Sequence, residues 1–396
     1  MKTIVHISCD FPDPIVPAKT KGVISFVDGT PGYRHVVYSL NRANWRKNLV
    51  AIDFETDRTA IAYGAPPKGL LLEGRLAHVA DYIRADLARK EIRPDLFHAH
   101  KLTVEGLVTH RLSGEMGVPY IASIWGDTDI KFISGRKDMA AKWRAIMRGA
   151  QRLLPCAPWT AQRFIADHGL DPARVEVMLP IVKQEEILAP IVTGEARIVT
   201  LFNLDQHKRK NLKGLLDAVV ELHRKDPRAT LDIWGRGDAE TLCDIDAMIE
   251  ARGAQDFIAL KGPLPQGAFE TTLNGYTAFA MPTLRETFGM VFVEALLCGL
   301  PVLHTRGWGI DGIYPDDTIG YAWDHGTQSD IVAGLRYLIE NEEPLKQNLR
   351  TLAQAGAFDQ HRRQVIVARY QEVLEVACQS GMAGRIGECE DETRSR

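Results

Sequence analysis

The chain has 396 residues, of which 45% are hydrophobic and 25% charged, and its formal net charge is −3. This length predicts two or three domains at about 150 residues each, and the composition is typical of a soluble globular protein. No window approaches the roughly 20 apolar residues of a membrane span, so the sequence predicts no transmembrane helix.

The six cysteines are scattered, with no CxxC pair and no Cys/His spacing suited to zinc. Cys156, Cys243 and Cys298 lie in apolar surroundings and are expected to be buried, reduced thiols, which favours a cytoplasmic protein. Residues 1–10 predict a first strand rather than a signal peptide, because the apolar run is short and ends at Asp10.

Charge is distributed unevenly along the chain. Residues 1–185 carry a net charge of +6 and the remaining residues −9. The basic first half suits an anionic partner, either a phosphate-bearing acceptor or a membrane surface met peripherally at its inner face. Its charge density is too low to indicate nucleic acid.

Short runs rich in Val and Ile alternate with helical patterns in the first half. Strands are expected at 3–8, 36–40, 49–54, 96–100, 120–125, 153–156 and 175–179. Helices are expected at 70–91, 103–116, 137–149 and 159–168. This alternation predicts right-handed βαβ units around a parallel sheet.

A second alternation follows residues 180–196, which two prolines and a glycine mark as a linker. Strands are expected at 197–204, 230–234, 257–260, 279–282 and 301–305. Helices are expected at 211–225, 238–252, 288–298, 328–341 and 345–377.

The domain organisation follows from these elements. We expect an α/β fold of two Rossmann-like, doubly wound domains at 1–185 and 196–356, facing one another across a cleft. A C-terminal helix at 357–379 should pack back toward the first domain, and 380–396 should be a disordered tail. Ligands of such sheets lie outside the carboxyl ends of the strands, so the cleft is the expected substrate site.

The most informative stretch is residues 281–302, MPTLRETFGMVFVEALLCGLPV. It predicts a strand, a loop with Glu286, a helix opened by Gly289 and a further strand. Free backbone amides at Gly289, Met290 and Val291 would form a diphosphate site at the positive end of the helix. Glu294 falls in the second turn, within reach of sugar hydroxyls. The alternative is that both glutamates are merely solvated.

This stretch resembles the signature of the retaining glycosyltransferases of family 4, with Thr283 where serine is usual. The resemblance implies a GT-B fold, with the acceptor bound by the first domain and the nucleotide sugar by the second. It implies that Glu286 lies near the donor sugar, that Glu294 binds the ribose, and that the loop amides hold the diphosphate. The donor-binding residues implied in this loop are Arg285, Thr287, Phe288, Gly289, Met290 and Val291.

Residues 201–218 resemble the family's lysine-bearing segment, and Lys210 matches the family lysine best. A cation at a strand-to-helix turn stabilises charge that grows on a leaving diphosphate. Asn203 stands in place of the family arginine, so Arg209 is expected to supply the second charge. Gly235 matches a glycine turn at the next strand end. The alternative is a solvated basic turn.

In the first half, residues 121–130 resemble the family's strand that ends in His-Gly-Thr-Asp, with Trp125 in place of the histidine. In the family that histidine touches the donor sugar, so the resemblance makes Trp125 and Asp127 candidates for the acceptor or sugar side. Asp127 and Asp129 also spell the metal motif of single-Rossmann glycosyltransferases, which we interpret as coincidence. We therefore expect no metal and no cofactor.

Two more first-half features are candidates for the acceptor or sugar side. His98 and His100 share one strand face, with a structural role as the alternative. Lys19, Lys21 and Gly22 lie in a loop where the family usually carries a Gly-Gly pair, and we interpret it as an altered phosphate or acceptor loop.

Residues 131–152 predict a basic amphipathic helix, which can lie on anionic lipid. The alternative is a helix packed on its sheet with a solvated basic face.

The sequence therefore predicts a retaining glycosyltransferase that moves a hexose-like sugar from a nucleotide diphosphate sugar to a glycan or glycolipid acceptor. Polysaccharide or lipopolysaccharide synthesis is the expected setting. The alternatives are a sugar-nucleotide epimerase on the same scaffold and a non-catalytic sugar-nucleotide-binding relative.

Overall fold

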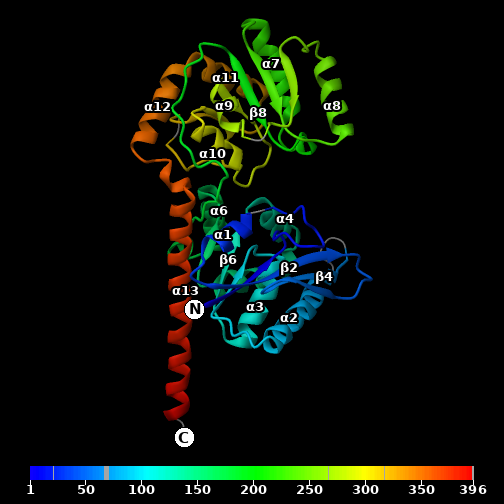
Figure 1. Ribbon diagram of the computed structural model, residues 1–396, viewed down its shortest axis with the longest axis vertical. Helices are drawn as coiled ribbons and strands as arrows, with labels where there is room; N and C mark the ends of the chain where they lie inside the picture. The colour runs from blue at the N-terminus through cyan, green and yellow to red at the C-terminus, as the bar shows by residue number, and fades with distance from the viewer. Residues whose placement is uncertain (21, 67–70, 266, 316, 395–396) are drawn as a thin grey trace. The chain divides into compact units, whose positions relative to one another are not determined.

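The computed structural model describes residues 1–20, 22–66, 71–265, 267–315 and 317–394. The chain forms two compact units (Figure 1). The first contains residues 1–156, 160–181 and 363–396, and the second contains 157–159 and 182–362. Each unit is built on a mostly or wholly parallel sheet with helices on its faces, so the expected fold class of two doubly wound α/β domains is confirmed.

The first unit holds a seven-stranded sheet in the order β3-β4-β2-β1-β5-β6-β7. Its strands are β1 Thr3–Ser8, β2 Arg34–Ala43, β3 Val50–Glu55, β4 Arg58–Gly64, β5 Leu96–Ala99, β6 Tyr120–Ile124 and β7 Leu153–Pro155. Neighbours are parallel except β3 and β4, which pair antiparallel at one edge. The expected strand at 175–179 is wrong, because only an isolated bridge joins Val175 to Leu153.

Strand β4 and the hairpin that it forms with β3 are absent from the sequence prediction. The turn between them contains Asp57, which has a φ of +60°. Hairpins are recognised in sequences mainly by Asn-Gly or Asp-Gly turns, and this turn carries Thr56-Asp57 instead.

Helices cover both faces of the first sheet. They are α1 Gly22–Gly29, α2 Leu72–Arg89, α3 Val104–Met116, α4 Asp127–Gly135, α5 Ala140–Gly149, α6 Pro158–His168 and α13 Arg363–Arg394. Helices α2, α3 and α5 contribute buried residues to one large core with the sheet. Helices α1 and α13 contact one another, and α13 also contacts β5.

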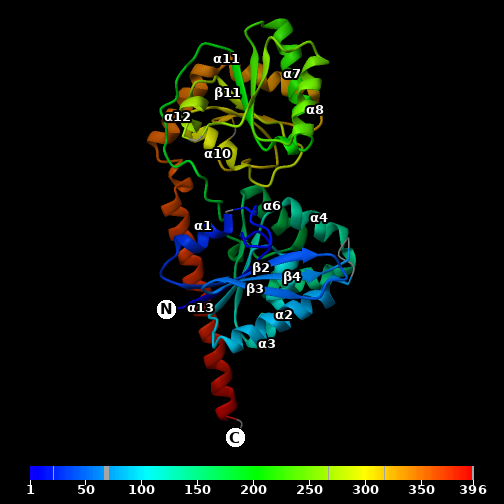
Figure 2. The same ribbon diagram turned by 45° about the vertical axis from the view of Figure 1, so that its right-hand side comes forward.

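The second unit holds a six-stranded parallel sheet in the order β10-β9-β8-β11-β12-β13. Its strands are β8 Arg197–Leu201, β9 Thr230–Trp234, β10 Ile258–Gly262, β11 Ala278–Ala280, β12 Val302–Thr305 and β13 Gly320–Trp323. Its helices are α7 Leu212–Lys225, α8 Ala239–Glu250, α9 Phe269–Asn274, α10 Met290–Leu297, α11 Gln328–Glu340 and α12 Glu342–Gln354 (Figure 2). Helix α9 and strand β13 are absent from the sequence prediction.

The expected helix at 345–377 is two helices. Helix α12 ends at Gln354 and α13 begins at Arg363, and between them Gly356 adopts a φ of +72°. Glycine takes this left-handed backbone at little cost, so it ends the first helix. Helix α13 continues to Arg394, which differs from the tail expected at 380–396. That segment contains no proline to stop a helix.

From Val182 onward the expected linker belongs to the second unit, and hydrogen bonds fix its backbone. Glu342 accepts hydrogen bonds from the backbone N–H groups of Thr193 (2.8 Å) and Gly194 (2.9 Å). The fully buried Lys346 ammonium donates to Glu342 (2.8 Å) and to the carbonyl groups of Ile191 and Tyr276. Since its polar groups have partners, this segment needs no secondary structure to be fixed.

Candidate functional site

The loop between β11 and α10 carries the first part of the site. Gly289 precedes α10 with a φ of +71°, and a Cβ there would lie 2.7 Å from the Phe292 ring. Glycine is therefore required at this position. Among the described residues, none accepts a hydrogen bond from the backbone N–H groups of Gly289, Met290 and Val291. They lie at the positive end of the helix, as expected of an anion site.

A buried ion pair between Lys210 and Glu286 forms the second part. Lys210 Nζ donates to Glu286 Oε2, and both side chains are buried. Burial lowers the pKa of the Lys210 ammonium, and the neighbouring Glu286 carboxylate opposes that shift. The structure thus brings together the two residues that the sequence singles out.

Backbone hydrogen bonds fix the two loops that carry this pair. The carbonyl group of Arg209 accepts from the backbone N–H of Leu284 (3.0 Å) and from Thr283 Oγ1 (3.2 Å). The carbonyl group of Glu286 accepts from the backbone N–H of Gly309 (3.1 Å). The carbonyl groups of Arg209 and Glu286 therefore hold the two loops in place without using their charged side chains.

Two tryptophans support the Glu286 loop, and the sequence reasoning missed both. Trp159 Nε1 donates to the carbonyl group of Thr287 (3.0 Å), and the Trp159 and Trp308 rings lie 4.8 Å apart. The Gly-Trp-Gly run at 307–309, directly after β12, was an available signal for Trp308. Trp159 is distant in the sequence and gives no local signal.

Glu294 lies in the second turn of α10, as expected. Its carboxylate is half-buried and accepts from the backbone N–H of Lys183 (3.4 Å). Burial raises the pKa of Glu294, while Lys183 acts in the opposite direction.

The other expected donor-side residues lie at the carboxyl ends of β8, β9 and β11. Arg209 donates to Gln206 Oε1 (2.5 Å), and the exposed Asn203 accepts from the backbone N–H of Asp205 (3.1 Å). A Cβ at Gly235 would collide with the carbonyl oxygen of Phe202, so only glycine fits there. Arg285 is exposed and Thr287 half-buried, whereas the Phe288 ring is buried and leaves only its backbone for a ligand.

In the first unit, Trp125 and the two aspartates lie where β6 meets α4. The backbone N–H of Trp125 donates to Asp129 Oδ2 (3.2 Å), and Asp127 pairs with Lys131 (2.9 Å). Burial raises the pKa of Asp129 to about 7, with Glu105 acting in the same direction. Among the described residues, the two aspartates are not part of any His, Cys, Asp or Glu cluster with metal-ligand spacing.

His100 belongs to a buried chain of histidines on the first sheet. His6 Nδ1 lies 3.0 Å from His100 Nε2, and His6 Nε2 lies 2.8 Å from His35 Nδ1. His98 bonds Tyr370 Oη (2.7 Å) and Ser123 Oγ (2.8 Å). His6, His98 and His100 lie close enough to bind a metal ion, but both nitrogens of His6 and of His98 already have partners.

The loop before α1 uses its lysine internally. Lys19 Nζ lies 2.7 Å from Asp13 Oδ2 and donates to Ser39 Oγ (2.8 Å). Gly22 begins α1, and a Cβ there would lie 3.7 Å from Trp125 Cη2. Lys21 lies outside the described residues.

Helix α5 corrects the expectation for residues 131–152. Its apolar residues Trp143, Ile146 and Met147 are at most 2% exposed and belong to the core of the first unit. This apolar face is therefore unavailable to lipid, and the alternative of a packed helix with a solvated basic face holds. Among the described residues, no helix has the length and apolarity needed to cross a bilayer.

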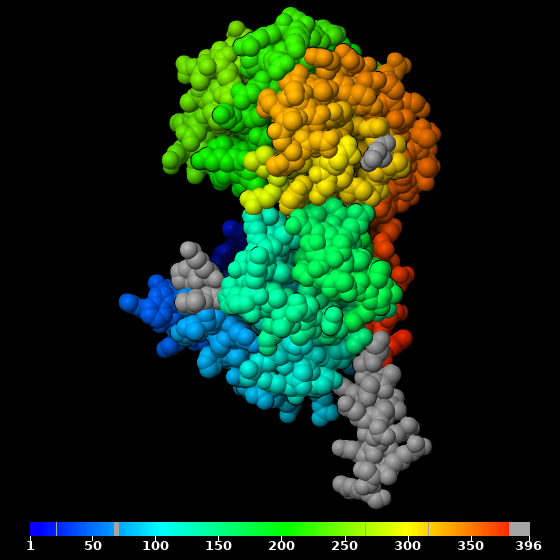
Figure 3. All heavy atoms as spheres, turned by 180° about the vertical axis from the view of Figure 1, so that it is seen from behind, coloured from blue at the N-terminus to red at the C-terminus, as the bar shows by residue number. Residues whose placement is uncertain are grey.

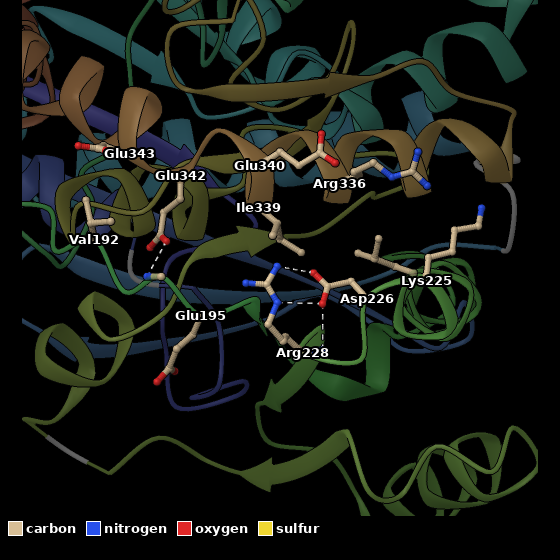
Figure 4. Close-up of a pocket in the computed structure, with 12 residues that line it drawn as sticks. Val192, Glu195, Lys225, Asp226, Arg228, Arg336, Ile339, Glu340, Glu342 and Glu343 are labelled. Carbon is tan, nitrogen blue, oxygen red and sulfur yellow. Dashed lines mark hydrogen bonds and ion pairs between the residues drawn. The ribbon is translucent and has the colours of Figure 1, made fainter.

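A separate hollow of about 810 Å³ opens at the amino-terminal edge of the second sheet. Figure 4 shows Asp226 and Arg228 paired side by side in its lining. Its lining residues come from the linker, the carboxyl ends of α7 and α11, and the start of α12. None of them is a candidate site residue.

Two family models match the chain. Residues 184–355 match the glycosyl transferases group 1, and residues 30–180 match the glycosyl transferase 4-like domain. The chain belongs to glycosyltransferase family 4.

Curated relatives share about a quarter of their residues with this chain over the matched regions. The D-inositol 3-phosphate glycosyltransferase of Frankia alni is 26% identical over 268 residues, covering 62% of this chain and 65% of that protein. The N-acetyl-alpha-D-glucosaminyl L-malate synthase of Bacillus anthracis is 25% identical over 150 residues, covering 38% of this chain and 39% of that protein. The match thus spans just under two thirds of the first relative's length.

Solved structures share the fold. Sucrose-phosphate synthase of Thermosynechococcus elongatus has a TM-score of 0.68 at 15% identity, covering 95% of this chain and 98% of that one. Anabaena HepE, in complex with UDP and glucose, has a TM-score of 0.66 at 16% identity, covering 95% and 100%. The expected GT-B fold is confirmed.

Gly289→Ala tests the amide site. The added Cβ would strain both the left-handed backbone and the contact with Phe292, so we expect a loss of about 1–3 kcal/mol in unfolding free energy. Binding of a nucleoside diphosphate should also weaken, as measured by calorimetry. Gly307→Ala is the matched control, because Gly307 has the same φ of +71° but no atom within 4 Å of the added Cβ. Equal losses in the two variants would contradict the steric argument.

The histidine chain predicts acid sensitivity. Burial lowers the pKa of His6 and His100 well below the ordinary value and that of His98 to about 3. The unfolded chain therefore binds protons below pH 6.5 that the fold does not, and stability falls on acidification by about 1.4 kcal/mol per pH unit for each neutral histidine. Asp129 opposes this, since its raised pKa favours the fold at low pH.

Urea unfolding at pH 7.5 and 5.0 checks this prediction. The free energy of unfolding of the first unit should be lower at pH 5.0, and His98→Gln should reduce the difference by about one histidine's share. If the change in unfolding free energy between pH 7.5 and 5.0 were the same in His98→Gln as in the wild type, His98 would not contribute to the acid sensitivity.

Proposed function

We propose that this family 4 member is a retaining glycosyltransferase. It transfers a sugar from a nucleoside diphosphate sugar to a glycan or glycolipid acceptor bound by the first unit. The observation that supports this most directly is the buried Lys210–Glu286 pair beside the amides of residues 289–291, which have no acceptor within the described part of the chain. Together they place positive charge and a carboxylate at the carboxyl ends of β8 and β11, where ligands of doubly wound sheets bind.

The chemistry needs stabilisation of a leaving group. The bond between the anomeric carbon and the diphosphate oxygen breaks, while the acceptor oxygen bonds the same face of that carbon. The acceptor's proton passes to the leaving phosphate oxygen, so no protein base is required. Lys210, Arg209 and the α10 amides stabilise the negative charge that develops on the diphosphate.

The two glutamates have separate roles in this proposal. Glu294 lies on α10 beyond the diphosphate amides and hydrogen-bonds the ribose. Glu286 lies before the helix and faces the donor sugar, where its orientation is held by Lys210. The positive ammonium also offsets the cost of keeping the Glu286 carboxylate ionised inside the protein.

The relatives indicate which substrates to test first. HepE is described in complex with UDP and glucose, so UDP is the first nucleotide to test here. A relative that acts on D-inositol 3-phosphate is consistent with an anionic acceptor, which the net charge of +6 on residues 1–185 would attract.

Substitution of each glutamate tests these roles. Glu294→Ala should weaken binding of bare UDP by roughly tenfold or more, which corresponds to a charge-assisted hydrogen bond of about 1.5–3 kcal/mol. Glu286→Gln should leave that affinity nearly unchanged but lower kcat by about 10² or more. Calorimetry with UDP and steady-state rates measure both effects.

Three outcomes would contradict these assignments. Wild-type turnover in Glu286→Gln would remove its role at the sugar. Exchanged phenotypes would reverse the two roles. Conversion of the donor without an acceptor would indicate a sugar-nucleotide epimerase instead.

We also propose that the reaction needs no metal ion, since lysine, arginine and backbone amides supply the positive charge. Turnover should therefore persist after treatment with EDTA. Loss of turnover that Mn²⁺ or Mg²⁺ restores would contradict this, and Asp127→Asn would then show whether that residue binds the ion.

A further inference from the structure

The first unit exposes an unbroken apolar loop at residues 14–18, Pro-Ile-Val-Pro-Ala. All five residues are exposed, with Ile15 at 36% and Val16 at 42%. Runs of exposed apolar side chains are avoided in soluble proteins unless they bind something.

This exposure is built into the fold. The buried Asp13 carboxylate accepts the backbone N–H groups of Ile15 and Val16, both at 2.8 Å. It also accepts from Ser39 Oγ (2.5 Å), Asn41 Nδ2 (2.8 Å) and Lys19 Nζ (2.7 Å). The loop is thus fixed to β2 with its apolar side chains turned to solvent.

Strand β3 extends the apolar surface on the same face of the sheet. Val50 is 53% exposed and Ile52 is 43% exposed. Asn41 and Val50 both pair with Ala62, and Ser39 and Ile52 both pair with Ala60. Partners across a sheet share a face, so Val50 and Ile52 lie two strands, about 10 Å, from the residues that anchor the loop.

The turn between β2 and β3 adds an aromatic residue and cations. Residues 44–48 are all exposed, with Trp45 at 46%. The Arg46 guanidinium lies 5.0 Å from the centre of the Trp45 ring. In Figure 3 this part of the chain, in blue, protrudes at the edge of the unit.

We propose that these segments form a binding surface for an anionic lipid bilayer. This edge patch consists of Ile15, Val16, Trp45, Val50 and Ile52 with Arg46 and Lys47. Ile15, Val16 and Trp45 enter the interfacial region, and the two cations contact acidic headgroups.

Charge favours a bilayer over a second copy of the chain. The exposed cations of this surface are Arg42, Arg46 and Lys47, since the Lys19 ammonium is paired with the buried Asp13 carboxylate. Residues 42–52 contain no Asp or Glu. Two such surfaces would repel one another, and lysine is depleted in protein interfaces. Tryptophan and cations around protruding aliphatic side chains are instead typical of interfacial membrane binding.

Co-sedimentation of the full chain with vesicles tests the proposal. The chain should bind vesicles of mixed phosphatidylcholine and phosphatidylglycerol more strongly than pure phosphatidylcholine, and salt should weaken the binding. Ile15→Ser/Val16→Ser should lower the partition coefficient by about tenfold or more. Arg46→Glu/Lys47→Glu should remove the preference for anionic vesicles.

Ile191→Ser/Val192→Ser is the matched control, since these side chains are 57% and 41% exposed in the second unit. It should bind vesicles like the wild type, and all variants should keep the wild-type circular dichroism spectrum and affinity for UDP. No binding by the wild type, equal binding by the patch variants, or a dimer that those variants dissociate would each overturn the proposal. It does not depend on the proposed activity.

Discussion

The buried ion pair between Lys210 and Glu286 is the constraint on which the donor side of this protein depends. Removing two charges from water costs several kcal/mol for each, and only close geometry offsets that cost. The loops after β8 and β11 are accordingly joined through the carbonyl group of Arg209 and fixed from the other side by Gly309. Loss of either partner would leave an uncompensated buried charge, at a cost of about 3–5 kcal/mol.

Most of the residues that hold the Glu286 loop in place differ from the charged residues proposed to act on the donor. Main-chain atoms and aromatic rings hold the Glu286 loop, including Trp159 through the carbonyl group of Thr287. Besides pairing with Lys210, the Glu286 carboxylate accepts the backbone N–H of Thr287 (3.1 Å), so one of its oxygens also helps to fix the loop. In such a site, residues around the donor can be substituted while the backbone N–H groups of residues 289–291 keep their positions.

Local signals were enough to predict much of this fold. The strands 3–8 and 230–234 agree residue for residue, and Gly289 precedes its helix as the motif at 281–302 predicts. The resemblance assigned Lys210 and Glu286 to the donor side but did not predict that these residues, 76 positions apart, form an ion pair. Long-range contacts could not be predicted: Trp159 lies 128 positions from the Thr287 carbonyl group. The amphipathic pattern of α5 is the same whether its apolar face meets a core or a lipid, so only the structure could decide. The exposure of the apolar side chains at residues 14–18 could not be predicted either, because a proline-rich stretch predicts a turn but not which side chains face solvent.

The junction before β8 has a consequence for proteolysis. A protease must draw several residues of extended backbone into its active site, and residues 188–194 are held by Leu297, Asn274, Arg350, Lys346 and Glu342. A protease that cuts beside aliphatic residues should therefore act slowly at Ile191 and Val192, although both side chains are exposed. Cleavage there would report the opening of the second unit itself rather than the movement of a free hinge.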